Sequence, residues 1–215
     1  HDACREALSA PVDTQNAEAL LLRFLGLEAY ASVFGADEKT REALDALQKN
    51  LRPKNVLRQD AFSGKQVMCL AALAFPEDDA LMQRIQALPV SDRTYTMEDA
   101  LASAALASAG RWRAAWEHIP AADAMYASAG TAALAYMTIM EGLLGMEWNG
   151  NTLALHAHVP EAWDSLTLTL HAGASTWHVE AARAIRQASC DGEKTADPIA
   201  IHDDGHIHQV RVPLN

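Results

Sequence analysis

The spacing of apolar residues along this chain changes near residue 145 from a helical repeat to strict alternation. From Thr131 to Leu144, apolar side chains recur at helical spacing, and Gly145 stands where a left-handed glycine often ends a helix. Asn149-Gly150-Asn151 is a turn signal, and alternation begins directly after it. We therefore predict helices before residue 145 and strands after it. The inward positions expected in the last helix are Leu134, Met137, Ile139, Met140 and Leu144.

Two C-terminal segments alternate between apolar and polar residues. The first runs from Thr152 to Val159 and stops at Pro160, and the second runs from Ser165 to His171. Ile207 is out of phase with Val210, which predicts a β-bulge in the last strand. The pattern favours a few antiparallel strands, as a small sandwich or as a sheet packed on the helices. Further strands are expected around residues 177–181, 199–201 and 210–214, with a loop at Cys190-Asp191-Gly192 and a turn at Asp203-Asp204-Gly205.

Start and stop signals divide the N-terminal two-thirds of the chain into a succession of helices. Thr96 and Asp99 resemble a capping box that opens an Ala-rich helix ended by Gly110. Ala-rich helices at close spacing are typical of tight packing, as in a helical hairpin array or part of an α/α toroid. The other expected helices are a segment capped by Asp13 or Thr14 and ended by Gly26, a short one up to Gly35, and segments from Asp37 to Pro53, 66–75, 76–88 and Arg111 to Pro120.

The amino-acid composition argues against two classes of partner, nucleic acid and anionic lipid. Of the 215 residues, 50% are hydrophobic and 21% are charged, which suits a globular chain with a real core. The formal net charge of -11 argues against nucleic acid and against attachment to anionic lipid, because both need a basic face. No apolar run reaches the about 20 residues that cross a bilayer.

The cysteines indicate the redox compartment of the chain, and its first residues indicate how it was produced. Cys4, Cys69 and Cys190 are odd in number and widely spaced, which favours a reducing compartment over a disulfide framework. The chain begins at His1, without Met or a signal-peptide pattern. We interpret it as a piece of a longer protein, or as a processed one.

Histidines are the first candidates for chemistry. Alternation in the first strand puts His156 and His158 on one face, the geometry of a metal pair, and Gly150 precedes them as in the first half of a cupin motif. The second half of that motif is missing, and an exposed sheet face holds histidines by composition alone. We therefore assign no metal ligand and no cofactor. The β-region histidines are His156, His158, His171, His178, His202, His206 and His208.

Carboxylates and tryptophans near the helix–strand junction are the candidates for sugar chemistry. The carboxylates are expected to form a solvated rim rather than an acid/base pair. We expect Trp163 and Trp177 to fill the core, while Trp148, at a turn, is the candidate surface indole for a sugar ring. There is no nucleophile elbow and no Gly-rich phosphate loop. The carboxylates concerned are Glu141, Glu147, Glu161 and Asp164.

Several short stretches carry a family resemblance when taken in order. They are Tyr126-Ala127-Ser128-Ala129-Gly130, Glu141-Gly142-Leu143-Leu144-Gly145, Gly150-Asn151-Thr152-Leu153, Trp177-His178-Val179 and His208-Gln209-Val210-Arg211-Val212. Over roughly the last ninety residues, this order resembles the C-terminal end of the inverting glycoside phosphorylases (cellobiose and chitobiose phosphorylases), and most closely that of cyclic β-1,2-glucan synthases. The resemblance implies the last helix of an (α/α)6 barrel followed by a β domain.

What the resemblance implies for function is glucan handling without catalysis. The family's general acid lies in an Asp-Trp-Asn-Asp-like stretch that this chain lacks, and Met97 stands where the family has a phosphate-holding His. A thioether cannot donate a hydrogen bond to phosphate. We therefore assign no catalytic residue, and name Tyr126, Ser128 and Trp148 as candidate substrate-binding residues.

These observations combine into one prediction with two alternatives. The chain is expected to be α+β: a helical, α/α-barrel-like array over residues 1–145 and a small antiparallel β-sandwich domain over 146–215. It would scaffold a glucan synthase-like parent or hold glucan, with β-glucan or oligosaccharide and the rest of the parent as partners. The parent would lie in the cytoplasm or at the cytoplasmic face of the inner membrane. The alternatives are a carbohydrate-binding or structural interaction module with no enzymatic parent, and a metal-dependent β-domain enzyme.

Overall fold

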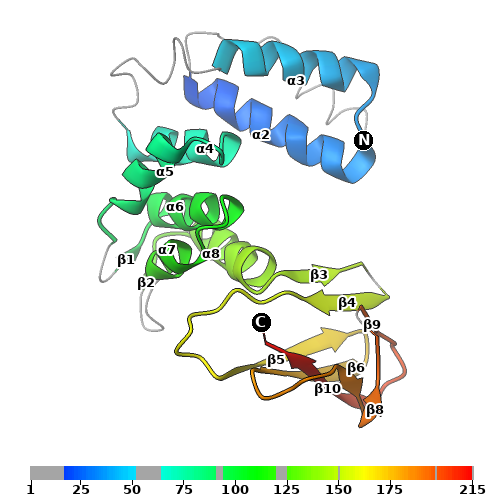
Figure 1. Cartoon of the computed structure of the whole chain (residues 1–215). Helices are drawn as coiled ribbons and strands as arrows, with labels where there is room; N and C mark the ends of the chain where they lie inside the picture. Colours follow the sequence, from blue (N-terminus) through cyan, green and yellow to red (C-terminus); the bar gives the residue numbers. More distant parts are fainter. Residues whose placement is uncertain are drawn as a thin grey trace.

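The computed structural model describes residues 17–51, 64–90, 94–119, 125–149, 151–196 and 198–214. Within these ranges helices predominate up to Leu143 and strands from Met146 onward, so the expected α+β class is confirmed (Figure 1). Asp13, Thr14, Pro53, Gly150 and Pro120, which enter the predictions above, lie outside the described ranges. The helices are α2 (Ala17–Phe34), α3 (Glu38–Leu51), α4 (Lys65–Ala74), α5 (Asp79–Gln86), α6 (Met97–Ser108), α7 (Trp112–Glu117), α8 (Ala129–Met137) and the π-helix η1 (Thr138–Leu143).

Helix α2 is longer than predicted. It runs through Gly26, which was expected to end it, and stops only at Gly35, whose φ is 81°. Leu27 and Tyr30 continue the buried stripe beyond Gly26, at 0% and 6% exposure. A glycine inside a helix costs about 1 kcal/mol relative to alanine, and burying two large side chains outweighs that cost.

The predicted helix caps are confirmed where the structure describes them. Asp37 Oδ1 accepts hydrogen bonds from the backbone N–H and the hydroxyl of Thr40, at 2.8 and 2.7 Å, at the start of α3. Thr96 and Asp99 form a reciprocal capping box at the start of α6. These side chains satisfy backbone N–H groups that have no partner within the helix.

The last helix ends in a wider turn than an α-helix. Leu144 donates its N–H to the carbonyl of Ile139, five residues back, at 2.8 Å, as a π-helix requires. Met137, predicted to face inward, is 50% exposed, because burial here follows Thr131, Ala135 and Thr138 instead. Because threonine is polar, the spacing of apolar residues alone does not identify the buried face of this helix.

Gly145 ends this helix as predicted, and its lack of a side chain is essential. Its φ is 53°, and a Cβ at this position would lie 2.5 Å from the carbonyl oxygen of His156. The backbone N–H of His156 donates to the carbonyl of Gly145 at 3.1 Å. The junction between helix and strand is therefore a close backbone contact that only glycine allows.

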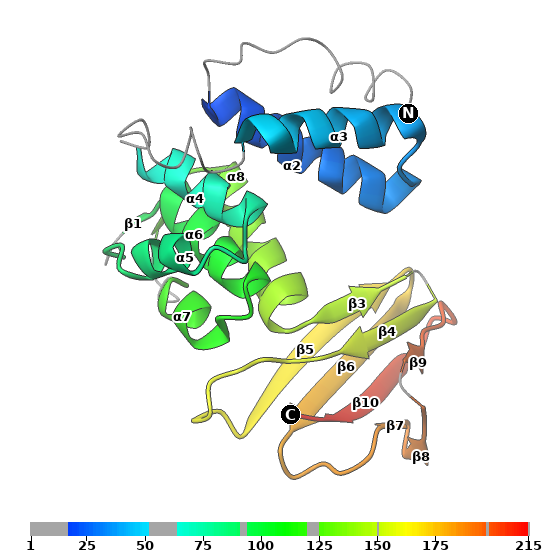
Figure 2. The ribbon, with the colours of Figure 1, turned by 45° about the horizontal axis from the view of Figure 1, so that its top comes forward.

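The strands form three small sheets. A two-stranded parallel pair, β1 with β2, lies among the helices and was not predicted. The β region holds a three-stranded sheet of order β3-β4-β9 and a five-stranded sheet of order β5-β6-β10-β7-β8 (Figure 2). The strands are β1 (Thr94–Tyr95), β2 (Met125–Tyr126), β3 (Met146–Trp148), β4 (Thr152–Leu155), β5 (Ser165–Ala172), β6 (Ser175–Ala182), β7 (Ser189–Cys190), β8 (Glu193–Lys194), β9 (Ile199–Ala200) and β10 (Ile207–Pro213).

The topology corrects two predictions about the β region. Strand β10 pairs with β6 in parallel, so the region is not purely antiparallel. The register is continuous from Ile207 opposite Thr176 to Pro213 opposite Ala182, without the expected bulge. Ile207 breaks the apolar phase because it is 66% exposed, while His208 takes the buried position. The predicted loop at Asp191-Gly192 is a tight hairpin between β7 and β8, with both residues at positive φ.

The two largest core clusters of the described residues lie in the helical and β regions, and a small third one joins Tyr95, Ala100 and Ala135. The helical cluster gathers apolar side chains from α2 through α7, together with Leu143 of η1. The β cluster combines Leu153 and Ile199 of the three-stranded sheet with Trp177 and Val210 of the five-stranded sheet. The described helices do not close into a barrel. None of them is long and apolar enough to cross a membrane.

Candidate functional site

The three predicted substrate-binding residues do not come together. Tyr126 ends β2 and Ser128 caps the start of α8, whereas Trp148 lies in β3, just beyond the end of η1. Residues 129–143 of α8 and η1 separate them by about 20 Å along the helix axis, at about 1.5 Å per residue. A single small sugar therefore cannot contact all three residues.

Tyr126 and Ser128 have local structural roles. The Ser128 hydroxyl caps α8 by accepting from the N–H of Thr131 at 3.1 Å. The ring of Tyr126, which is 42% exposed, packs edge-on against buried Tyr95, with ring centroids 5.6 Å apart. The carbonyl of Tyr95 also accepts from the N–H of Ala127, which ties the two strands of the β1–β2 pair together.

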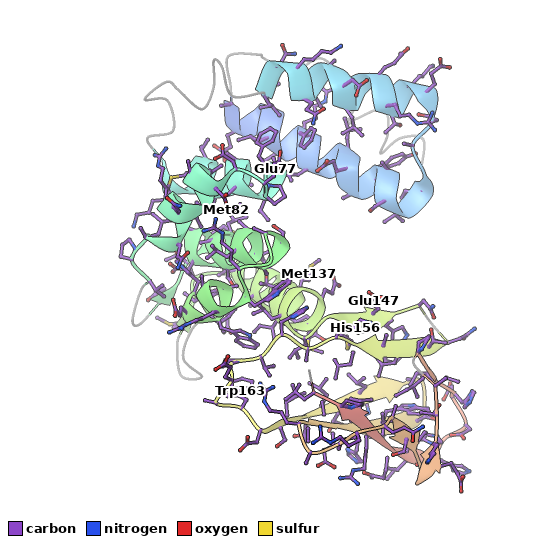
Figure 3. The ribbon with its side chains drawn as sticks, in the orientation of Figure 1. Glu77, Met82, Met137, Glu147, His156 and Trp163 are labelled. Carbon is purple, nitrogen blue, oxygen red and sulfur yellow. The ribbon has the colours of Figure 1, made fainter. Side chains whose placement is uncertain are left out.

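Trp148 lines an open pocket on the β3–β4 hairpin, of about 490 Å³. Pairing sets Glu147 opposite Ala154, so both side chains leave the same face of the hairpin. His156, just beyond the end of β4, also lines the pocket (Figure 3). Trp148, 37% exposed, completes the lining from the edge strand. The lining residues are Glu147, Trp148, Asn149, Thr152, Ala154, His156 and Pro198.

The turn of the hairpin holds polar groups of this pocket in place. Asn149 Oδ1 accepts from the backbone N–H of Thr152 at 3.1 Å and from its hydroxyl at 2.7 Å. Both residues line the pocket, so the side-chain amide of Asn149 has a set orientation there. An indole, a carboxylate, an amide and an imidazole around one opening are groups that can hydrogen-bond and stack on a polar ring.

The other candidates from the sequence are distributed differently. Among the four junction carboxylates, Glu141, Glu161 and Asp164 are exposed and do not line this pocket, as expected of a solvated rim. Trp177 is fully buried, as predicted, but Trp163 is 42% exposed, which corrects the expectation that it fills the core. Trp163 follows Pro160, where no strand is formed, so its ring lies at the surface against Trp116, with centroids 5.2 Å apart.

His156 and His158 do not act as a metal pair. His156 lines the Trp148 pocket, whereas the ring of His158 stacks on Trp112, with centroids 4.1 Å apart. The carbonyl of His158 accepts from the indole N–H of Trp116 at 2.6 Å. Strand β4 ends at Leu155, so the alternation that placed both rings on one face does not extend to these residues. His158 instead packs on α7, through its ring on Trp112 and its carbonyl on Trp116.

A polar cluster around His208 was not predicted from the sequence. His208 Nδ1 lies 2.8 Å from Asp191 Oδ2, and its Nε2 lies 3.0 Å from Asp204 Oδ1. Hydrogen bonds with these two carboxylates raise the pKa of His208 and lower the pKa of Asp204. The side chains of Cys190, Asp191 and His208 form the one group of at least three metal-ligating side chains in the described part of the chain. The Asp-Gly hairpin was the visible clue to part of this cluster.

No family model matches the chain, and no curated protein matches it.

Proposed function

We propose that this chain holds an oligosaccharide at the Trp148 pocket and does not cleave it. The observation that carries the proposal is the grouping of Trp148, which is 37% exposed, with Glu147, Asn149 and His156 as lining residues of an opening of about 490 Å³. Sugar rings present hydroxyl groups at their edges and C–H groups on their faces. A pocket with polar groups and one indole at its edge is matched to both.

We propose further that the chain derives from a glucan synthase-like or phosphorylase-like parent, with an incomplete α/α barrel and a β-sandwich domain. Two segments aligned with that family, around Thr96 and around Ser128, support this, because β1 and β2 bring them side by side. A Cβ at Gly130 would lie 3.5 Å from Met97 Cε, so Met97 lies against the start of α8. That thioether cannot hydrogen-bond phosphate, which supports a role without phosphorolysis.

Titration with β-1,2-glucan oligosaccharides and cello-oligosaccharides tests the binding proposal. We expect saturable binding by calorimetry and a change in tryptophan fluorescence. Trp148→Ala should weaken binding at least about tenfold, the equivalent of about 1.4 kcal/mol. The matched control is Trp163→Ala, because that indole is exposed to a similar degree but lies outside the pocket.

Two outcomes would contradict the proposal. Absence of binding at millimolar sugar, or equal binding by the Trp148→Ala variant, would remove the pocket from consideration. Release of glucose 1-phosphate from glucan and phosphate would overturn the non-catalytic part alone.

A structural interaction module is the second candidate, because apolar side chains are exposed on two helices. Tyr136 and Met137 of α8 are 62% and 50% exposed, and Val33 and Phe34 of α2 are 70% and 57% exposed. If sugar binding fails, these surfaces favour packing against the rest of a parent chain.

A further inference from the structure

Three side chains of metal-ligating types converge beside strand β10, in the five-stranded sheet rather than in the sheet that carries the Trp148 pocket. Cys190 Sγ, Asp191 Oδ2 and His208 Nδ1 all lie within 4.8 Å of one another. The Sγ–Oδ2 distance is 3.8 Å and the Nδ1–Oδ2 distance is 2.8 Å. In a tetrahedral zinc site with bonds of about 2.0 to 2.3 Å, ligand atoms lie about 3.3 to 3.8 Å apart. Movements of the three ligand atoms by less than about 1 Å would therefore bring them to the spacing of a tetrahedral zinc site.

Sheet register brings the sulfur and the imidazole to the same face. Cys190 of β7 pairs with Val210 of β10, and His208 lies two residues before Val210. Residues two apart on a strand share a face, so Cys190 and His208 are diagonal neighbours. His208 is also stacked on buried Trp177, with ring centroids 4.0 Å apart, which fixes the plane of its ring.

The hairpin turn aims the carboxylate of Asp191 at the same point. Asp191 has a φ of 51°, and it is the one non-glycine residue at positive φ in the described part of the chain. Its backbone N–H donates to the carbonyl of Gln209, and its Oδ1 accepts from the N–H of Gln209 at 2.7 Å. With Oδ1 held in this way, Oδ2 is left facing Cys190 and His208.

Nε2 of His208 has a carboxylate partner, as the second ring nitrogen of a metal-binding histidine commonly does. Nε2 lies 3.0 Å from Asp204 Oδ1, and the same oxygen accepts from the backbone N–H of His206. Asp204 is held in turn by Ser175, whose hydroxyl accepts from the Asp204 N–H at 2.8 Å. A carboxylate that accepts from Nε2–H sets the tautomer in which Nδ1 is free to bind a metal ion.

The electrostatics of the cluster call for a positive charge. The carboxylates of Asp191 and Asp204 lie 2.8 and 3.0 Å from the two ring nitrogens of His208. A bound divalent cation would release the thiol proton of Cys190 and would neutralise the negative charge gathered there. Asp191 is 48% exposed at its side chain, so solvent can reach the point between the three donors.

We propose that Cys190, Asp191 and His208 bind a divalent transition-metal ion of the zinc type, with the fourth position open to water and Asp204 orienting His208. The set of sulfur, nitrogen and oxygen donors suits zinc or cobalt better than calcium or magnesium, which prefer oxygen alone. The ion ties the β7–β8 hairpin, at the edge of the five-stranded sheet, to β10.

Cobalt titration of the whole, untagged chain after chelator treatment tests the proposal. We expect one equivalent of Co²⁺ to produce a thiolate-to-cobalt charge-transfer band and the strong visible bands of a tetrahedral ion, both reversed by Zn²⁺. Cys190→Ser should abolish the charge-transfer band. Asp204→Asn should weaken Zn²⁺ binding about 10- to 100-fold, as expected for a partner of a ligating His.

Matched variants separate this site from the remaining thiols and histidines. Cys69→Ser, at a buried thiol in the helical cluster, and His202→Gln, at an exposed imidazole, should leave the bands and the affinity unchanged. Asp191→Asn removes the carboxylate ligand and should weaken Zn²⁺ binding, with circular dichroism showing that the variant is folded. Absence of the charge-transfer band in the wild-type chain would overturn the proposal. So would a Zn²⁺ affinity that Cys190→Ser and Asp191→Asn leave unchanged.

Discussion

The helix caps of the helical region and the turn aspartates of the β region bind partners at different ranges along the chain. In the helical region, the capping bonds of Asp37, Asp78 and Thr96 join residues three positions apart. In the β region, Asp203, Asp204 and Asp191 bind groups 17 to 29 positions away. The first kind fixes where a helix begins, and the second holds the turns of different strands against one another. Substitutions should therefore have local effects in one region and long-range effects in the other.

Removing the central indole of the β cluster should have the largest effect. Trp177 is fully buried between both sheets, and Trp177→Ala should lower the free energy of unfolding by about 3 to 5 kcal/mol. Denaturant unfolding gives the total, and hydrogen exchange gives its location. We expect faster exchange in β6 and β10 and unchanged protection in α4 and α6. Equal loss of protection in those helices would show that the two regions unfold as one unit.

Two glycines at positive φ sharpen the comparison within the β region. A Cβ at Gly173 would lie 1.9 Å from Asp203 Oδ2, whereas nothing lies within 4 Å of one at Gly192. Both substitutions to alanine cost about 1 to 2 kcal/mol of backbone strain. Gly173→Ala also displaces Asp203 and its 2.7 Å bond from the N–H of Ala174, for a total of about 2 to 4 kcal/mol. Thermal unfolding of both variants checks the order, and equal losses would contradict this account.

Removing the hydroxyl groups of Ser175 and Thr96 in turn compares a long-range hydrogen bond with a local helix cap. The Ser175 hydroxyl accepts from the N–H groups of Asp204 and Gly205, and its residue is fully buried. Ser175→Ala should cost about 2 to 3 kcal/mol, because two backbone N–H groups lose their shared acceptor at a buried position. Thr96→Ala removes one helix cap and should cost about 1 kcal/mol. Urea unfolding measures both, and a larger loss for Thr96→Ala would reverse the comparison.

His118 should produce the smallest effect, visible as a pH dependence of stability. Burial lowers its pKa, more than the carbonyl of Gln86 and the charges of Asp99 and Glu117 raise it. The neutral ring is therefore favoured in the folded chain. Its stabilisation is complete above the unfolded pKa of about 6.5 and is lost as the pH falls from there through the lower, folded pKa.

Unfolding midpoints measured between neutral and mildly acidic pH check this sign. The wild-type midpoint should fall on acidification, and His118→Gln should remove part of that fall. His202→Gln, at an exposed ring, is the control and should keep it. A steeper fall in the His118→Gln variant would show that the pKa moves in the opposite direction.

Local signals in the sequence predicted much of the secondary structure. The capping box at Thr96, the end of the last helix at Gly145 and the alternation from Ser165 to Ala172 all rest on interactions within a few residues. The same reasoning failed at Gly26, because packing of Leu27 and Tyr30 outweighs the local preference of glycine. It also failed at Met137, because threonines occupy the buried face of that helix.

The candidate sites were less accessible to sequence reasoning than the fold. Trp148 was identified as a surface indole from its turn, but its pocket depends on the pairing of β3 with β4 and on Pro198 from a distant segment. The His208 cluster depends on β10 lying between β6 and β7, with one parallel and one antiparallel neighbour.

By itself, the sequence of this protein determined where helices give way to strands, because caps, turns and periodicity act between near neighbours. Only the tertiary structure decided which distant side chains share a site. A parallel strand pairing places His208 beside Trp177 and within reach of Asp191 and Asp204. No periodicity encodes that proximity, because it arises from the register between strands far apart in the chain.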